Sequence, residues 1–149
     1  MPVVVERFEC TCGDRRQLGL LLGRQIGRAD RAVASDRLGI GFEAARAQNP
    51  GLIWVAISGY GPTGPYANQP AYDMVIQARG GFAKLLGSDS EPKLISNLVA
   101  DKTSGLTAAW ATLAALLSRE KTGKGQRVEV PMLDAFASFV LPDVLGAQA

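Results

Sequence analysis

The chain has 149 residues, of which 47% are hydrophobic and 20% are charged, and its formal net charge is +2. This length and composition predict one globular domain that can bury a core, and so small a charge gives no reason to expect nucleic acid as a partner. No apolar stretch approaches the about 18 residues of a membrane span and the N-terminus lacks a secretory pattern, so we expect a cytoplasmic protein without membrane contact.

Residues 1–35 have an unusual composition. Arginine and glycine are scattered through them without a clean period, and no lysine occurs before Lys84. This predicts an atypical N-terminal segment, either disordered or not native coding sequence. Cys10 and Cys12 form a lone C-x-C pair, and the chain has no other cysteine and no histidine, so the usual zinc ligand sets cannot be completed. We expect no metal site and place the start of the consistent part of the chain near residue 36.

From residue 36 onward, hydrophobic periods and turn residues agree with one another. The run LIWVAIS at 52–58 is typical of a buried, parallel strand. The loop GYGPTGP follows at 59–65, where ligand loops of α/β folds lie. Alternation of helices and strands from residue 36 predicts the α/β class. The remaining expected elements are a helix at 42–48, a helix at 73–79, a short strand at 94–99, a long helix at 103–120, a strand at 126–130 and a helix at 132–140.

Asp101 lies between a short apolar run and the long helix. A carboxylate at that point is either an ordinary helix N-cap or a nucleophile held at the positive end of the helix. The local pattern leaves both interpretations open. The helix itself has apolar residues at a spacing of three and four, as an amphipathic helix does: Leu106, Ala109, Trp110, Leu113, Leu116 and Leu117.

Four separated motifs resemble the class III CoA-transferase family, which includes formyl-CoA transferase, carnitine-CoA transferase and α-methylacyl-CoA racemase. In chain order they are DRLGIGFEAARAQNPGLIWVAISGYGPTGPY, AYDMVIQARGG, LVADKTSGL and LAALLSREKTGKGQRVEVPMLDA. The resemblance implies an incomplete, nucleotide-binding-like α/β domain of the class III CoA-transferase fold, with residues 36–149 as the central part of the large domain. It also implies an acyl-CoA thioester and a carboxylic acid as substrates, no bound cofactor, and a homodimer for full-length members.

The resemblance assigns the catalytic aspartate to Asp101, in LVADKTSGL. The implied reaction moves coenzyme A between carboxylic acids through a covalent aspartyl intermediate, which needs neither histidine nor metal. Tyr72 and Asp73 match a pair next to the active site. Tyr72 would hydrogen-bond an acyl group or is simply packed, and Asp73 would position the substrate acid or cap the helix 74–79. The racemases carry histidine at position 72, and because tyrosine is a poor base at neutral pH, a racemase-like isomerase is the less favoured alternative.

Four further residues are candidates for contacts with coenzyme A. Gly59 and Gly61 could present backbone N–H groups to a thioester or a phosphate. Met132 matches a family position near the coenzyme A tail, and Lys124 belongs to a basic cluster after the long helix. Each has a structural alternative: a tight turn, a core methionine and a solvated helix end. The sequence therefore indicates a CoA-transferase fragment that carries the nucleophile, with a truncated inactive copy as a further alternative.

Overall fold

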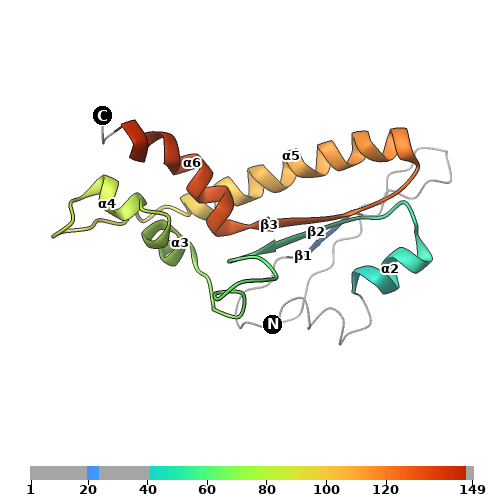
Figure 1. Cartoon of the computed structure of the whole chain (residues 1–149), viewed down its shortest axis with the longest axis horizontal. Helices are drawn as coiled ribbons and strands as arrows, with labels where there is room; N and C mark the ends of the chain where they lie inside the picture. The colour runs from blue at the N-terminus through green and yellow to red at the C-terminus, as the bar shows by residue number, and fades with distance from the viewer. Residues whose placement is uncertain (1–19, 24–40, 147–149) are drawn as a thin grey trace.

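A parallel sheet of three strands lies at the centre of the chain, in a computed structural model that describes residues 20–23 and 41–146 (Figure 1). The middle strand is β2 (Ile53–Ser58), and β1 (Leu20–Gly23) and β3 (Arg127–Pro131) pair with it on either side. The apolar, β-branched run of β2 suits a strand that is covered on both faces. The predicted α/β class is confirmed.

In the described part of the chain, helix α5 (Val99–Thr122) runs along one face of the sheet, and helix α2 (Phe42–Gln48) lies on the other side, near the start of β2 (Figure 1). Ile53 and Val55 point to one face and join the core that α5 covers, whereas Trp54 points to the other face and meets Phe42 of α2 edge-on, with ring centroids 6.5 Å apart. This alternation is the two-residue period of a strand. The helices are α2 (Phe42–Gln48), α3 (Asp73–Arg79), α4 (Phe82–Leu86), α5 (Val99–Thr122) and α6 (Met132–Gly146).

The predicted strand at 94–99 is wrong. Residues 87–98 form a loop without regular structure, and α5 already begins at Val99. The backbone N–H of Ile95 donates to the side chain of Gln77 rather than to a neighbouring strand. The short helix α4 was not expected either, because Gly80 and Gly81 suggested a stop. Gly81 has a φ of +82°, a conformation that glycine adopts at no steric cost, and the chain turns through it directly into α4.

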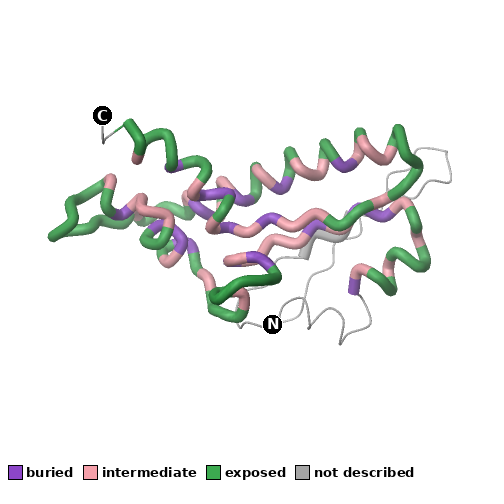
Figure 2. Tube along the Cα trace, viewed as in Figure 1, coloured by how far each residue is buried: buried purple, intermediate pink, exposed green. Residues whose placement is uncertain are grey.

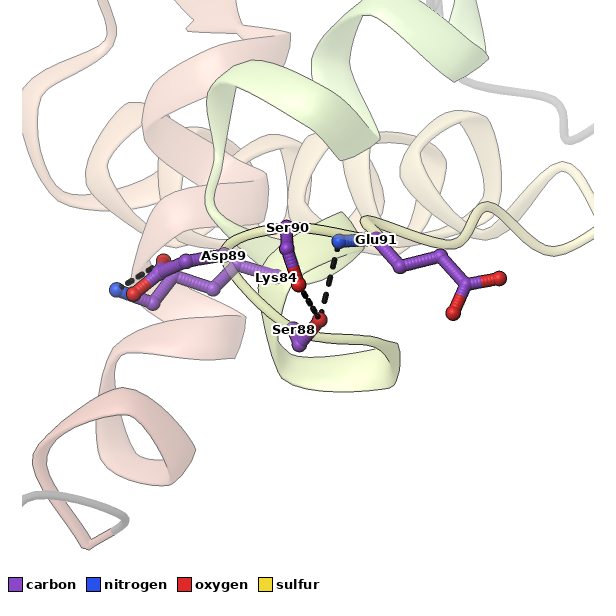
Figure 3. Close-up of polar contacts among 5 residues, drawn as sticks. All are labelled: Lys84, Ser88, Asp89, Ser90 and Glu91. Atoms are coloured by element: carbon purple, nitrogen blue, oxygen red, sulfur yellow. Dashed lines mark hydrogen bonds and ion pairs between the residues drawn. The ribbon is translucent and has the colours of Figure 1, made fainter.

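The loop between α4 and α5 begins with a compact polar turn (Figure 3). The backbone N–H of Glu91 donates to Ser88 Oγ at 3.0 Å, and Ser88 Oγ lies 3.1 Å from Ser90 Oγ. An ion pair joins Lys84 Nζ of α4 to Asp89 Oδ1 at 2.7 Å. Because both partners are exposed, this pair shapes the turn but adds little stability. The loop then runs back to α3, where residues 95–97 dock.

Part of the segment that we predicted to be atypical belongs to the sheet. Leu20–Gly23 pairs with β2 in parallel register, from Leu20 opposite Ile53 to Gly23 opposite Ala56. The rest of residues 1–35, with Cys10 and Cys12, lies outside the described residues. The boundary near residue 36 stays a prediction. Within the described residues, no helix combines the length and the apolar character that crossing a membrane requires.

The residues of α5 that are buried in the core are small, and Leu116 is the one large α5 residue that packs against the sheet cluster. Figure 2 shows buried and exposed positions alternating along this helix. Ala108 and Ala115 pack against the sheet residues Ile53, Val55 and Val130. In an amphipathic helix the large apolar stripe would face the core. Here the small side chains let the helix lie close to the sheet, and four large apolar residues remain more than half exposed: Leu106, Trp110, Leu113 and Leu117.

Substitutions on the two faces of α5 should differ in how much stability they cost. We expect Ala108→Leu to lower the free energy of unfolding by about 1–3 kcal/mol, because added methylenes must fit between α5 and β2. We expect Leu113→Ala to change it by only about 0.5 kcal/mol, since that side chain is exposed. Urea unfolding followed by circular dichroism measures both values. A larger loss for Leu113→Ala than for Ala108→Leu would contradict this assignment of faces.

Candidate active site

Asp101 lies in the first turn of α5 and is half-buried. The N-cap position belongs to Leu98, whose side chain makes no capping hydrogen bond, so the interpretation of Asp101 as the N-cap residue is wrong. The helix begins four residues earlier than the sequence suggested and takes Asp101 in. The carboxylate remains within the first turn, where the helix macrodipole favours an anion.

The buried carboxylate of Asp73 reaches the start of α5 from another helix. Its Oδ2 accepts a hydrogen bond from the backbone N–H of Asp101 at 2.9 Å, and its Oδ1 accepts one from Gln77 Nε2 at 2.5 Å. The side chain is 6% exposed. The expectation that Asp73 caps helix 74–79 needs correction, because Tyr72 is the N-cap of α3 and Asp73 is its first residue. Asp73 satisfies a donor of α5 instead, which the first turn of a helix cannot satisfy internally.

The start of α5 lies at the carboxyl edge of the sheet. Helix α5 connects two parallel strands and therefore runs back against them: near its end, Arg119 Nη1 donates to the carbonyl of Gly51, just before β2 begins. At the opposite edge, the N–H of Leu133 in α6 donates to the carbonyl of Gly59 at 3.0 Å. Ligands of open α/β sheets bind outside the carboxyl ends of the strands. Asp101 therefore occupies the edge at which this architecture accepts ligands.

The two glycines predicted to approach coenzyme A are buried and pack against the chain itself. A Cβ at Gly59 would overlap the Cβ of Ala71. Gly61 has a φ of +83°, and its N–H donates to Ser58 Oγ at 3.0 Å. That N–H is therefore engaged in the turn after β2. These contacts explain both glycines by the tight-turn alternative, and a role in binding coenzyme A stays a prediction.

A double substitution tests the packing at Gly59. We expect Gly59→Ala to cost about 1–3 kcal/mol of unfolding free energy, because its new methyl group meets Ala71. Since the φ of Gly59 is not positive, an alanine suits the backbone and only the clash matters. In a protein that already carries Ala71→Gly, the Gly59→Ala substitution should cost much less unfolding free energy, because the methyl group that it would meet is absent. Thermal unfolding of the four proteins gives the coupling energy, and purely additive losses would exclude this contact.

Met132 and Lys124 lie at different ends of the molecule. Met132 is buried with Ala100 and Phe136 in the core beneath the start of α5, as the core alternative expected. Lys124 is exposed and follows the other end of α5. At about 1.5 Å of rise per residue, the helix separates it from Asp101 by roughly 30 Å. The structure therefore does not bring Lys124 into one compact site with Asp101.

Arg79 fastens the glycine- and proline-rich loop to α3. Its guanidinium lies over the rings of Tyr66 and Tyr60, at 4.3 and 5.2 Å from the ring centroids, and Nη2 donates to Gln69 Oε1 at 3.0 Å. These contacts hold the loop in place before α3. Tyr72, at the end of the loop, has an exposed side chain and precedes the buried Asp73. Arg79 was expected only as the last residue of the helix 73–79, and Tyr60 and Tyr66 are too distant in sequence for a local pattern to reveal the stacking.

Gln77 is the site residue that the sequence analysis missed. It lies one helical turn after Asp73, and glutamine and aspartate four residues apart on a helix are a known hydrogen-bonding pair. That spacing was the available signal. The partners of Gln77 in the loop before α5 are 18 and 20 residues away, and local patterns do not reveal them.

Comparison with known proteins assigns the chain to a family. Residues 29–149 match the family described as CoA-transferase family III. The chain belongs to CoA-transferase family III. It is similar to the succinate–glutarate CoA-transferase of Agrobacterium fabrum, with 36% identity over 99 residues, which are 66% of this chain and 25% of that protein. It is also similar to formyl-CoA:oxalate CoA-transferase of Escherichia coli, with 43% identity over 103 residues, which are 68% of this chain and 25% of that protein.

The fold of this family III chain also resembles solved structures. A CAIB/BAIF family protein from Brucella suis superposes with a TM-score of 0.72 and 36% sequence identity, over 76% of this chain and 30% of that one. The chain spans about a quarter of the length of the curated relatives it matches. The expected resemblance to class III CoA-transferases is therefore confirmed, for a central part of the family's fold.

Proposed function

We propose that this chain carries the nucleophile of an acyl-CoA:carboxylate CoA-transferase, and that Asp101 is the nucleophile. The observation that carries the proposal is its position in the first turn of α5, with its backbone N–H bound by the buried Asp73. A helix N-terminus favours the ionised carboxylate, which is the form that attacks a carbonyl carbon. The names of the relatives, which pair coenzyme A transfer with succinate, glutarate or oxalate, support this class of reaction.

The proposed reaction has four substitutions at carbonyl carbons. An oxygen of Asp101 attacks the thioester, the C–S bond breaks, and coenzyme A leaves as a thiolate from a mixed anhydride. The thiolate attacks the aspartyl carbonyl and releases the first carboxylate, which leaves an aspartyl-CoA thioester. The second carboxylate displaces the thiolate from this thioester and forms a second mixed anhydride. The thiolate then attacks the acyl carbonyl of that anhydride. The products are the second acyl-CoA and the regenerated Asp101 carboxylate.

Tyr72 and residues at the carboxyl edge of the sheet have supporting roles in the proposed reaction. The exposed hydroxyl of Tyr72 would donate a hydrogen bond to the acyl or anhydride oxygen, where negative charge develops during attack. Gly59 and Met132 lie at the same edge as Asp101 and remain candidates to line the path of the thioester, whereas Lys124 lies too far away. A homodimer and a cytoplasmic location remain predictions from the resemblance and the sequence.

Covalent labelling tests the proposed function. The chain is incubated with succinyl-CoA or acetyl-CoA and quenched with hydroxylamine, which converts an anhydride or thioester at an aspartate into a hydroxamate. We expect tandem mass spectrometry to find the hydroxamate at Asp101. The same assay is run on a chimera, which is the full-length Escherichia coli relative with its matching segment replaced by residues 41–146 of this chain.

Each alternative predicts a different result in these assays. Hydroxamate at another carboxylate would contradict the assignment of Asp101. No label in either protein, together with no exchange of the α-proton of the acyl-CoA, would identify a truncated inactive copy. Exchange of the α-proton of a 2-methylacyl-CoA with deuterated solvent, without a label, would indicate a racemase-like isomerase, which the tyrosine at position 72 disfavours.

A further inference from the structure

The side-chain amide of Gln77 is completely buried and joins helix α3 to the loop before α5. Its Oε1 accepts a hydrogen bond from the backbone N–H of Ile95 at 3.2 Å. Its Nε2 donates to Asp73 Oδ1 and, at 3.0 Å, to the carbonyl of Asn97, with the carbonyl of Ile95 at 3.3 Å. The amide therefore fixes the end of the loop before α5 and one oxygen of Asp73 at the same time.

The orientation of this amide is determined by its partners. The Asn97 carbonyl can only accept a hydrogen bond, and the Ile95 N–H can only donate one. Turning the amide over would place Oε1 against acceptors and Nε2 against a donor. Because Gln77 and Asp73 are buried and Ile95 is half-buried, an unmatched group among them would lose its hydrogen bond without readily gaining water. The Gln77 amide thus holds Asp73 in one rotamer.

Asp73 passes this constraint on to the candidate nucleophile. With Oδ1 bound to Gln77, its Oδ2 is directed at the backbone N–H of Asp101, 2.9 Å away. The loop held by Gln77 also leads into α5 directly, since the N–H of Val99 donates to the carbonyl of Asn97 at 2.8 Å. The start of α5 is therefore held twice by one side chain, once through Asp73 and once through Asn97.

We propose that Gln77 is a positioning residue of the transferase site, which sets the place of Asp101 through Asp73 and through the loop carbonyls. This inference rests on the proposed function of Asp101. In this proposal Gln77 acts through Asp73 and the loop, not by binding the substrate. Nucleophilic attack depends on placement, and a displacement of about 1 Å lowers a rate by roughly 10²-fold. We therefore expect this buried network to set the position of the Asp101 carboxylate as well as to stabilise the fold.

The test uses Gln77→Leu, which keeps the size of the side chain and removes its hydrogen bonds. The rate of hydroxylamine-trapped labelling at Asp101 is measured against acyl-CoA concentration, in the protein that labels, whether the chain alone or its chimera. We expect the rate at saturating acyl-CoA to fall by about 10²-fold, with little change in the half-saturating concentration. Hydrogen exchange at the Asp101 amide should accelerate. Gln77→Glu should act similarly, since its oxygens face the acceptors Asp73 and Asn97.

Val55→Ala is the matched control, because Val55 is a buried residue of β2 in the other core cluster and makes no contact in the Gln77 network. It should lower the melting temperature while leaving the labelling rate and the Asp101 exchange close to wild type. Equal rates for Gln77→Leu and Val55→Ala would overturn the positioning role, and so would an Asp101 amide that stays protected in Gln77→Leu. If neither the unsubstituted chain nor the unsubstituted chimera is labelled, the proposed function fails and the positioning role with it. This result differs from the two above, in which the unsubstituted protein is labelled.

Discussion

Asp101→Asn should abolish covalent labelling by acyl-CoA. Asparagine has nearly the same shape and keeps the backbone N–H that donates to Asp73, so the start of α5 should remain intact. Its amide oxygen, however, cannot form an anhydride. Loss of the nucleophile of a covalent mechanism costs on the order of 10³-fold or more, so we expect the rate to fall to background. Mass spectrometry of the hydroxylamine-quenched protein and the turnover of the chimera both report this loss.

Asp134 offers a matched control for this substitution. It is an exposed carboxylate in the first turn of α6, and α6 starts at the same edge of the sheet. Asp134→Asn should leave the labelling rate unchanged, because helix position alone does not make a carboxylate a nucleophile. Labelling that survives in Asp101→Asn but disappears in Asp134→Asn would move the nucleophile to α6. The pair thus separates the general effect of a helix N-terminus from the chemistry of one residue.

Phe136→Ala should remove about 3–5 kcal/mol of unfolding free energy, the largest stability loss expected in the described part of the chain. Phe136 is 0% exposed and packs in one cluster with Ile76, Ala100 and Met132. Its ring also meets Phe82 of α4 edge-on, with centroids 5.5 Å apart. Truncation leaves a cavity that the surrounding helices cannot fill without moving. Because folded domains are stable by only about 5–15 kcal/mol, much of the margin would be lost.

Phe139 on the same helix is the comparison. It stacks on Phe136 at 6.2 Å between centroids but is 54% exposed. We expect Phe139→Ala to cost well under half of the Phe136→Ala value, since most of its surface already meets water. Urea unfolding gives both values, and an unchanged denaturant dependence would show that the unfolded states are comparable. Similar losses for the two substitutions would mean that the outer face of α6 is covered.

The sequence predicted the elements whose patterns are local. Helices 42–48 and 73–79 have the bounds expected, and β2 and β3 differ from expectation by one residue at their ends. Strong β-forming runs and glycine or proline stops determine such elements almost alone. The family was also predicted correctly, because four motifs in the right order constrain one another. What these signals share is that each can be read within a short stretch of chain.

The missed features depend on tertiary packing. The short apolar run before Asp101 resembled a strand, but the Gln77 side chain binds its backbone and α5 absorbs its end. The spacing of Leu106 and Trp110 indicated an apolar face without saying which face meets the sheet. The link between Asp73 and Asp101 crosses 28 residues of sequence. The family resemblance made both residues candidates for the site, but it did not show that Asp73 binds the backbone of Asp101.

The alanines of α5 have a consequence for the evolution of this chain. Ala100, Ala108 and Ala115 set how closely the helix lies on the sheet and core, and the same helix carries Asp101 in its first turn. A larger residue at any of these positions would lift the helix and shift the carboxylate with it. If Asp101 acts as proposed, selection for the reaction would therefore also act on these small residues of the helix.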